Sequence, residues 1–276
     1  ACFNAQRQGD FKPYLLKSTD KGKTWVSIAS NLPTRGTVYC LKQDPVQENL
    51  LFVGTEFGAY FSTDGGLNWT RLSGLPTVAV YDLDIQEREV DLVAATFGRG
   101  FYVLDNYSPL RILSKENLQK AAHLFPVKDA LLYIEADPLG LEGTGFQGHN
   151  MWSAKNPSFG ATFSLHVKDV PKDLKSTRQQ KEKDLEKEGK DVSYPSFDAL
   201  KAEELDEAAK FIWIISDAKG SEIRRMSSAA QAGLVRQNWD LRKASTNPIG
   251  GWGRGPLVVP GTYYLRVLQV HNGQVD

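Results

Sequence analysis

The sequence predicts an all-β chain whose first 107 residues form two to three four-stranded blades of a partial β-propeller. Two observations carry this prediction: a segment of the chain recurs after 44 residues, and each copy contains several short apolar or β-branched runs separated by turn formers. A period of about 40–45 residues with several short strands is typical of propeller blades. A propeller closes with typically four to eight blades. We therefore expect the other blades to come from the missing N-terminal part of a longer protein, or from another chain.

Composition excludes several classes of protein. The 276 residues carry 33 Lys and Arg against 33 Asp and Glu, so there is no broad positive field to favour nucleic acid as a partner. No apolar run approaches the roughly 20 residues that span a bilayer. Two cysteines and four scattered histidines lack the spacing of a metal site. We expect no metal, no cofactor and no membrane span.

The repeated segment contains a short motif. The octapeptide STDKGKTW, residues 18–25, recurs as STDGGLNW, residues 62–69. The flanking sequence follows it, because Val38-Tyr39 in one copy corresponds to Val80-Tyr81 in the next. A third, degenerate copy covers 96–106, where Leu104-Asp105-Asn106 stands in place of the motif.

One unit contains four predicted strands. They cover 37–42, 49–54, 59–62 and 69–72, with Asp44-Pro45 and Asp64-Gly65-Gly66 as turn formers between them. Residues 1–5 correspond to a second strand whose first strand is missing from the chain.

Turn chemistry accounts for the residue types of the motif. An Asp that opens a tight turn accepts backbone N–H groups, a Ser hydroxyl binds local backbone groups, and Gly supplies a positive φ. The Trp then begins the next strand and packs its ring against the blade. The structural positions of the two copies are Ser18, Asp20, Gly22 and Trp25, and Ser62, Asp64, Gly66 and Trp69.

Two copies of this motif resemble the Asp-box, or BNR repeat, of sialidase-like and sortilin-like β-propellers. The similarity covers residues 1 to about 107 and is strongest to the last blades of large bacterial sortilin-like proteins, which are often named glycosyl hydrolases by analogy. The resemblance implies that the boxes lie away from the active face, so Asp20 and Asp64 are structural. It also implies a periplasmic or extracellular setting. The arginine triad and the Tyr/Glu pair of sialidases are not recognisable here.

A candidate binding rim lies at the opposite end of the blades. The loops between second and third strands share a face with the connections between blades, where propellers commonly bind ligands. These loops carry a mixed-charge set suited to a sugar acid, a carboxylate or a peptide end: Arg7, Asp10, Lys12, Glu56 and Arg99. Glycosidases need two carboxylates, and Asp10 with Glu56 is the pair that these loops offer.

The second half of the chain changes character. Residues 108–158 form a linker and connecting strands, with a helix predicted over 114–124 and a strand over 129–135. The segment 171–192 has 13 charged residues in 22 and, with the Ala- and Glu-rich run that follows, makes a charged helical insertion over 171–209. Further strands are predicted at 211–215, 222–225, 233–240 and 261–268.

This second half also carries a resemblance. The run GLVRQNWDLR at 233–242 and the PGTYY turn at 260–264 look like the Ig-like sandwich of flagellar hook-capping proteins. The resemblance implies an Ig-like β-sandwich over 159–276, into which the helical segment is inserted.

Two functions remain open. In the first, the propeller face recognises a peptide, a protein partner or a glycan without catalysis. In the second, the chain belongs to a glycoside hydrolase whose catalytic residues lie mostly on blades outside it.

Overall fold

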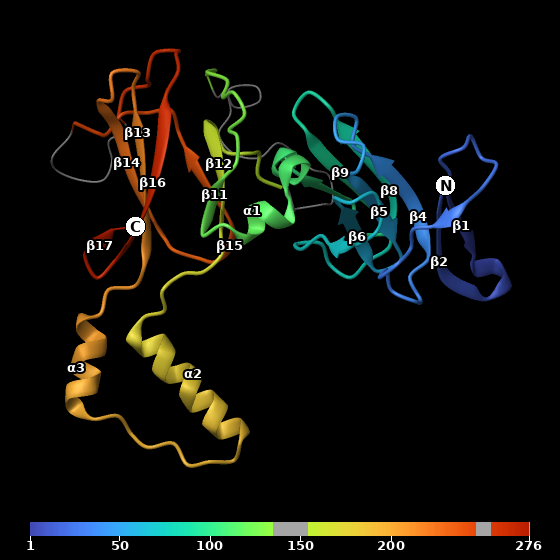
Figure 1. Ribbon diagram of the computed structural model, residues 1–276. Helices are drawn as coiled ribbons and strands as arrows, with labels where there is room; N and C mark the ends of the chain where they lie inside the picture. The colour runs from blue at the N-terminus through green and yellow to red at the C-terminus, as the bar shows by residue number, and fades with distance from the viewer. Residues whose placement is uncertain (135–153, 247–254, 276) are drawn as a thin grey trace. The chain divides into compact units, whose positions relative to one another are not determined.

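A computed structural model describes residues 1–134, 154–246 and 255–275 (Figure 1). The chain forms two compact units, Ala1–Asn117 and Leu118–Asp276. Strands in several small sheets make up most of the regular structure of both units, so the predicted all-β class is confirmed. The Gly-rich part of the predicted linker, 135–153, lies outside the described residues.

The first unit consists of three antiparallel sheets that follow one another along the chain. The first has the order β1-β2-β3, the second β4-β5-β6-β7 and the third β8-β9-β10. The strands are β1 Cys2–Ala5, β2 Asp10–Lys17, β3 Val26–Ser27, β4 Val38–Gln43, β5 Leu51–Thr55, β6 Gly58–Ser62, β7 Thr70–Arg71, β8 Val80–Gln86, β9 Asp91–Thr96 and β10 Phe101–Leu104. Short 3-10 helices cover Gln6–Gln8 (η1) and Ser108–Ile112 (η2). The second sheet therefore has the four strands that its sequence predicts.

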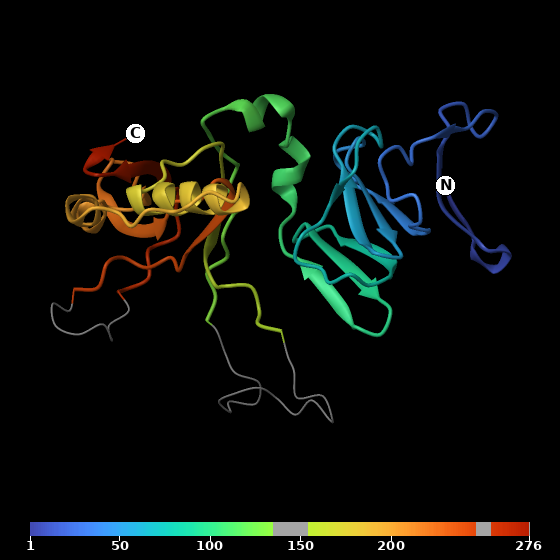
Figure 2. The ribbon, with the colours of Figure 1, turned by 90° about the horizontal axis from the view of Figure 1, so that it is seen from below.

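Consecutive sheets of this unit share apolar cores. Leu15 of the first sheet and Ile28, which directly follows β3, pack with Val53 of the second sheet. Phe52 of the second packs with Leu83 of the third. Figures 1 and 2 both show the β4–β7 and β8–β10 sheets side by side. Neighbouring sheets thus bury each other's faces, as the apolar strand runs require.

Close approach of these sheets depends on one glycine. A Cβ added to Gly54 in β5 would lie 2.5 Å from both Cys40 Sγ and the backbone oxygen of Val80. Val80 belongs to the next sheet, so a side chain at position 54 would push the two sheets apart.

The second unit contains two further antiparallel sheets. Their orders are β11-β12-β15 and β14-β13-β16-β17. The strands are β11 Ala122–Leu124, β12 Ala161–Val167, β13 Lys210–Ser216, β14 Glu222–Ala229, β15 Gly233–Trp239, β16 Tyr264–His271 and β17 Gln274–Val275. One core joins the two sheets, with the rings of Phe163 and Trp213 stacked 6.2 Å apart.

The helices of the second half lie largely where the sequence places them. Helices α2 (Leu174–Lys187) and α3 (Phe197–Leu205) fall within the charged insertion, and none of their residues is buried. Figure 1 shows both helices extending away from the strands of their unit. The prediction over 114–124 is too long, because α1 (Lys115–Gln119) ends early and β11 follows.

The strand predicted over 129–135 is wrong for its described part. Residues 129–134 contain no strand, although Ala130 packs against the core of the second unit. The apolar residues of this run include Leu131, Leu132 and Ile134, and all three are exposed. Apolar composition alone does not make a strand when no neighbouring strand supplies backbone hydrogen bonds.

Candidate functional site

Each repeated turn is held by a closed set of hydrogen bonds. In the first copy, Ser18 Oγ donates to Asp20 Oδ1 (2.8 Å) and accepts the Gly22 N–H (2.7 Å). Asp20 Oδ1 also accepts the backbone N–H of Thr24 (2.9 Å), and Oδ2 accepts the Thr24 hydroxyl (2.7 Å). The bonds from the Thr24 backbone and hydroxyl, followed by that from Ser18, lower the pKa of Asp20 to about 2. This carboxylate is committed to its own turn.

The second copy repeats these contacts. Ser62 Oγ donates to Asp64 Oδ1 (2.7 Å) and accepts the Gly66 N–H (2.9 Å), while Asn68 gives Asp64 both a backbone N–H (2.9 Å) and a side-chain N–H (2.7 Å). Burial opposes ionisation of Asp64, but the bonds from Asn68 and Ser62 outweigh it and lower its pKa. The two turns use the same chemistry at equivalent positions.

The two motif tryptophans differ in environment. Trp69 is 4% exposed, and its Nε1–H donates to the Ile28 carbonyl of the preceding repeat (2.7 Å). Asn31 binds the Trp69 backbone twice, through Oδ1 at 2.7 Å and Nδ2 at 2.9 Å. Trp25 is 49% exposed, and its Nε1–H donates to Gly22 within its own turn (3.1 Å). Trp69 therefore joins two consecutive sheets, whereas Trp25 closes its own turn.

A buried tyrosine directly follows the degenerate third copy, which ends at Asn106. Tyr107 is buried, its ring packs edge-on to Phe52 at 5.1 Å, and its hydroxyl donates to Asp44 Oδ2 (2.7 Å). Asn106 just before it adopts a positive φ of 44° and accepts the Ser108 hydroxyl (2.6 Å). Tyr107 thus ties the end of the third sheet to the second sheet.

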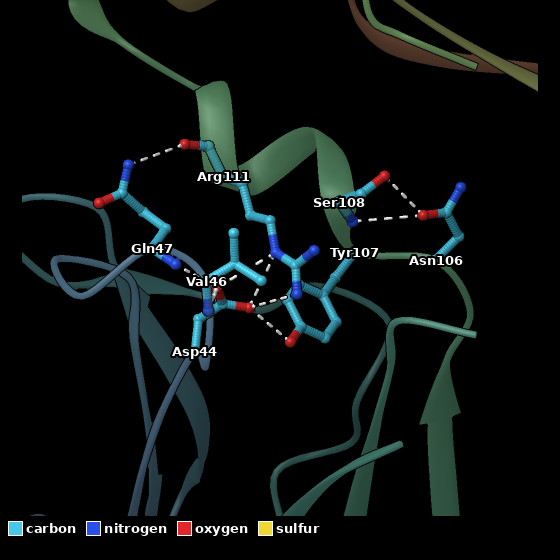
Figure 3. Close-up of polar contacts among 7 residues, drawn as sticks. All are labelled: Asp44, Val46, Gln47, Asn106, Tyr107, Ser108 and Arg111. Atoms are coloured by element: carbon cyan, nitrogen blue, oxygen red, sulfur yellow. Dashed lines mark hydrogen bonds and ion pairs between the residues drawn. The ribbon is translucent and has the colours of Figure 1, made fainter. Parts of the chain in front are cut away.

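Asp44 is the centre of this contact, which Figure 3 shows. Besides Tyr107 it accepts Arg111 Nε (3.0 Å), Arg111 Nη2 (2.9 Å) and the N–H groups of Val46 (2.9 Å) and Gln47 (2.6 Å). Burial would raise the pKa of Asp44, but the bonds from Arg111, Tyr107 and the two N–H groups outweigh it and lower that pKa. Burial and the Asp44 charge raise the pKa of Tyr107. The sequence identified Asp44 only as a turn former, and nothing in its local pattern pointed to Arg111.

The rim contains a pocket between the first two sheets. Its volume is about 570 Å³, and it is lined by Gly9, Asp10, Phe11, Lys12, Thr34, Arg35, Glu56 and Phe57. The structure therefore brings together three of the five residues expected at the rim, Asp10, Lys12 and Glu56. Among the described residues, Arg7 and Arg99 do not line this pocket.

Sequence reasoning missed Arg35 and the two phenylalanines of the pocket. Arg35 lies in the connection from β3 to β4, on the same face as the loops between second and third strands. Connections between sheets share the face of the rim loops, so the position of Arg35 in such a connection was the signal that pointed to it. Phe11 and Phe57 follow Asp10 and Glu56 directly.

Asp10 of the pocket accepts two hydrogen bonds. The Tyr14 hydroxyl donates to Asp10 Oδ2 and the Lys12 backbone N–H donates to Oδ1 (3.0 Å). These two bonds lower the pKa of Asp10. An ionised Asp10 suits an acceptor, a base or a nucleophile, and does not suit a general acid.

Within 1–134, 154–246 and 255–275, no three His, Cys, Asp or Glu side chains gather closely enough to hold a metal ion. None of the described helices combines the length and apolar character needed to cross a membrane.

The geometry defines a repeat protein in which short antiparallel sheets follow one another and carry a pocket at one end. No family model matches the chain. It is 32% identical over 78 residues to xyloglucanase Xgh74A of Acetivibrio thermocellus, and 35% identical over 68 residues to a probable oligoxyloglucan-reducing end-specific xyloglucanase of Neosartorya fischeri. These matches cover 25% and 22% of this chain, but 9% and 8% of the relatives.

One further relative and one solved structure each match part of the chain. The chain is 29% identical over 75 residues to a xyloglucanase of Hypocrea jecorina, covering 24% of this chain and 9% of that enzyme. The crystal structure of an ancestral GH74 enzyme matches 33% of this chain and 11% of that one, with 23% identity and a TM-score of 0.29. The chain thus has weak, partial homology to GH74 xyloglucanases, a family of β-propeller glycoside hydrolases.

Proposed function

We propose that residues 1–107 are blades of an Asp-box β-propeller whose rim pocket recognises a glycan. The observation that supports this best is the pocket itself, which combines charged groups with the rings of Phe11 and Phe57. A sugar needs both, since its hydroxyls form hydrogen bonds and its C–H faces pack on apolar surface. The homology to xyloglucanases favours a glycan over a peptide or protein ligand.

The exposure of Trp25 supports further blades beyond these residues. Trp69 is buried because the preceding sheet receives it, and Trp25 occupies the equivalent position with half of its surface open. Among the described strands, β1 pairs with β2 alone. We place the remaining blades in a longer protein or in another chain. In this proposal the two sheets of the second unit are an Ig-like sandwich that serves as a packing or docking module of a secreted or periplasmic protein.

Calorimetric titration with xyloglucan oligosaccharides tests glycan recognition. Arg35→Ala removes a pocket cation and should lower the affinity at least about fivefold. The matched control is Arg88→Ala, because Arg88 is an exposed arginine in the turn from β8 to β9, at the end of the sheet away from the rim, and does not line the pocket among the described residues. Equal affinities for wild type and the Arg35 variant, or an equal loss in both variants, would refute the assignment.

The homology also supports a second candidate, a glycoside hydrolase assembled with blades outside this chain. Asp10 would then act in its ionised form, and Glu56 or a residue of another blade would be the acid. The test is release of reducing ends from xyloglucan by the complete protein. Hydrolysis lost in Asp10→Asn with binding retained would support this candidate, and binding without hydrolysis in the wild type would reject it.

A further inference from the structure

Three aromatic side chains form a continuous row on the first unit. The ring centroids of Tyr39 and Tyr81 are 4.4 Å apart, and those of Tyr81 and Phe97 are 5.7 Å apart. Tyr39 lies in β4, Tyr81 in β8 and Phe97 just after β9, so the row crosses from the second sheet to the third. Tyr81 is 47% exposed and Phe97 is 69% exposed.

Equivalent β-bulges place the two tyrosines. The register between β4 and β5 shifts between Val38 and Cys40, and the register between β8 and β9 shifts between Val80 and Asp82. Tyr39 and Tyr81 are therefore the extra residues of two bulges at the same point of consecutive sheets. A bulge redirects a side chain away from the regular alternation of its strand, and bulges are common beside binding sites.

The row lies at the same end of the sheets as the pocket. The N–H of Glu56, a pocket residue, donates to the Thr37 carbonyl (3.0 Å), and the N–H of Phe97 donates to the Ala79 carbonyl (2.9 Å). Glu56 and Phe97 are thus equivalent residues of consecutive repeats. The accepting residues, Thr37 and Ala79, lie two positions before the bulge residues Tyr39 and Tyr81. Gln6 Nε2, from η1 beside the pocket loop, donates to the Tyr39 hydroxyl (2.6 Å) and fixes the first ring.

The chemistry of the two surfaces indicates one kind of occupant. The charged side chains of the pocket balance, with Asp10 and Glu56 against Lys12 and Arg35, which favours a neutral ligand over the sugar acid or carboxylate expected from the sequence. Exposed rings pack well against the C–H faces of sugar rings, since an aromatic face carries partial negative charge.

We propose, on the basis of the glycan-binding function above, that the Tyr39–Tyr81–Phe97 row supplies further subsites for a neutral linear oligosaccharide. One sugar ring occupies the pocket, and successive rings lie along the row toward Phe97. The affinity of the site then depends on the length of the oligosaccharide.

The test is a calorimetric titration with unsubstituted β-1,4-glucan oligosaccharides of two to six units. Wild-type affinity should rise along this series. Tyr81→Ala and Phe97→Ala should each lower the affinity for the six-unit chain by about five- to tenfold and leave the two-unit affinity unchanged. The matched control is Phe101→Ala, because Phe101 is 74% exposed on β10 and lies outside the row. Thermal unfolding checks that each variant folds.

The outcomes separate this inference from the function on which it rests. If affinity does not rise with length, or if Phe101→Ala weakens binding as much as Phe97→Ala, the row is not a subsite. Glycan recognition at the pocket then still stands, provided that Arg35→Ala weakens binding of the two-unit chain. If the wild type binds no member of the series, or binds a proline-rich peptide on the row in its place, the inference is overturned.

Discussion

The unequal roles of the two motif tryptophans can be measured by replacing each with phenylalanine. Trp69→Phe removes the indole N–H that donates to the Ile28 carbonyl. Ile28 is buried, so its carbonyl loses this donor away from water. An unsatisfied buried acceptor costs about 1–3 kcal/mol, and the lost ring volume adds about 1 kcal/mol. Trp25→Phe removes a bond to Gly22 at an exposed turn, where water replaces the donor, so its cost is below about 1 kcal/mol.

Hydrogen exchange followed by mass spectrometry is the suitable assay, because it reports the first unit separately from the second. A difference of about 2 kcal/mol between the variants is roughly a thirtyfold difference in opening equilibrium, and it should appear as faster exchange in β5 and β6 of Trp69→Phe. Equal exchange in the two variants, or faster exchange in Trp25→Phe, would refute the assignment of Trp69 as the contact between sheets.

Three further predictions concern the first unit. Asp64→Ala should lower the melting temperature without a selective loss of glycan affinity, and a variant that melts normally but does not bind would overturn its structural role. Arg111→Met leaves Asp44 buried without its cation and should destabilise the unit by about 3 kcal/mol in urea titration. Because folding lowers the pKa of Asp44, the wild-type unit should also lose stability as the pH falls below about 4. This loss of stability at low pH should be smaller in Asp44→Asn. Gly54→Ala should cost about 1–3 kcal/mol by the same assay, whereas Gly261→Ala in the second unit, at a position with open space around it and no positive φ, should cost less.

Much of the first unit follows from its sequence because the repeat supplies independent copies of one local rule. The octapeptide determines its own turn through Ser, Asp and Gly, and the bonds are the same in both copies. Where the motif degenerates the rule no longer applies. Tyr107 and Arg111 meet Asp44 across more than 60 positions of chain, and such a contact has no local signature.

The candidate site shows the same division between local and long-range information. Asp10 is the first residue of β2 and Glu56 lies between β5 and β6, so strand order places both at one end of their sheets. The packing of consecutive sheets determines which of the rim residues share the pocket. Arg35 lines the pocket, whereas Arg7 and Arg99 are absent from its described lining. The bulges at Tyr39 and Tyr81 are equally invisible in an alternation pattern, since each adds one residue that the pattern does not mark.

The most direct test of the account is the footprint of a bound xyloglucan oligosaccharide, measured by hydrogen exchange on the complete chain. We expect protection of 9–12, 34–35 and 56–57 at the pocket and of 79–81 and 97 along the aromatic row, with no change in the turns at 18–25 and 62–69. Protection confined to those turns, with the rim unchanged, would contradict the division of the repeat into a structural turn and a binding rim.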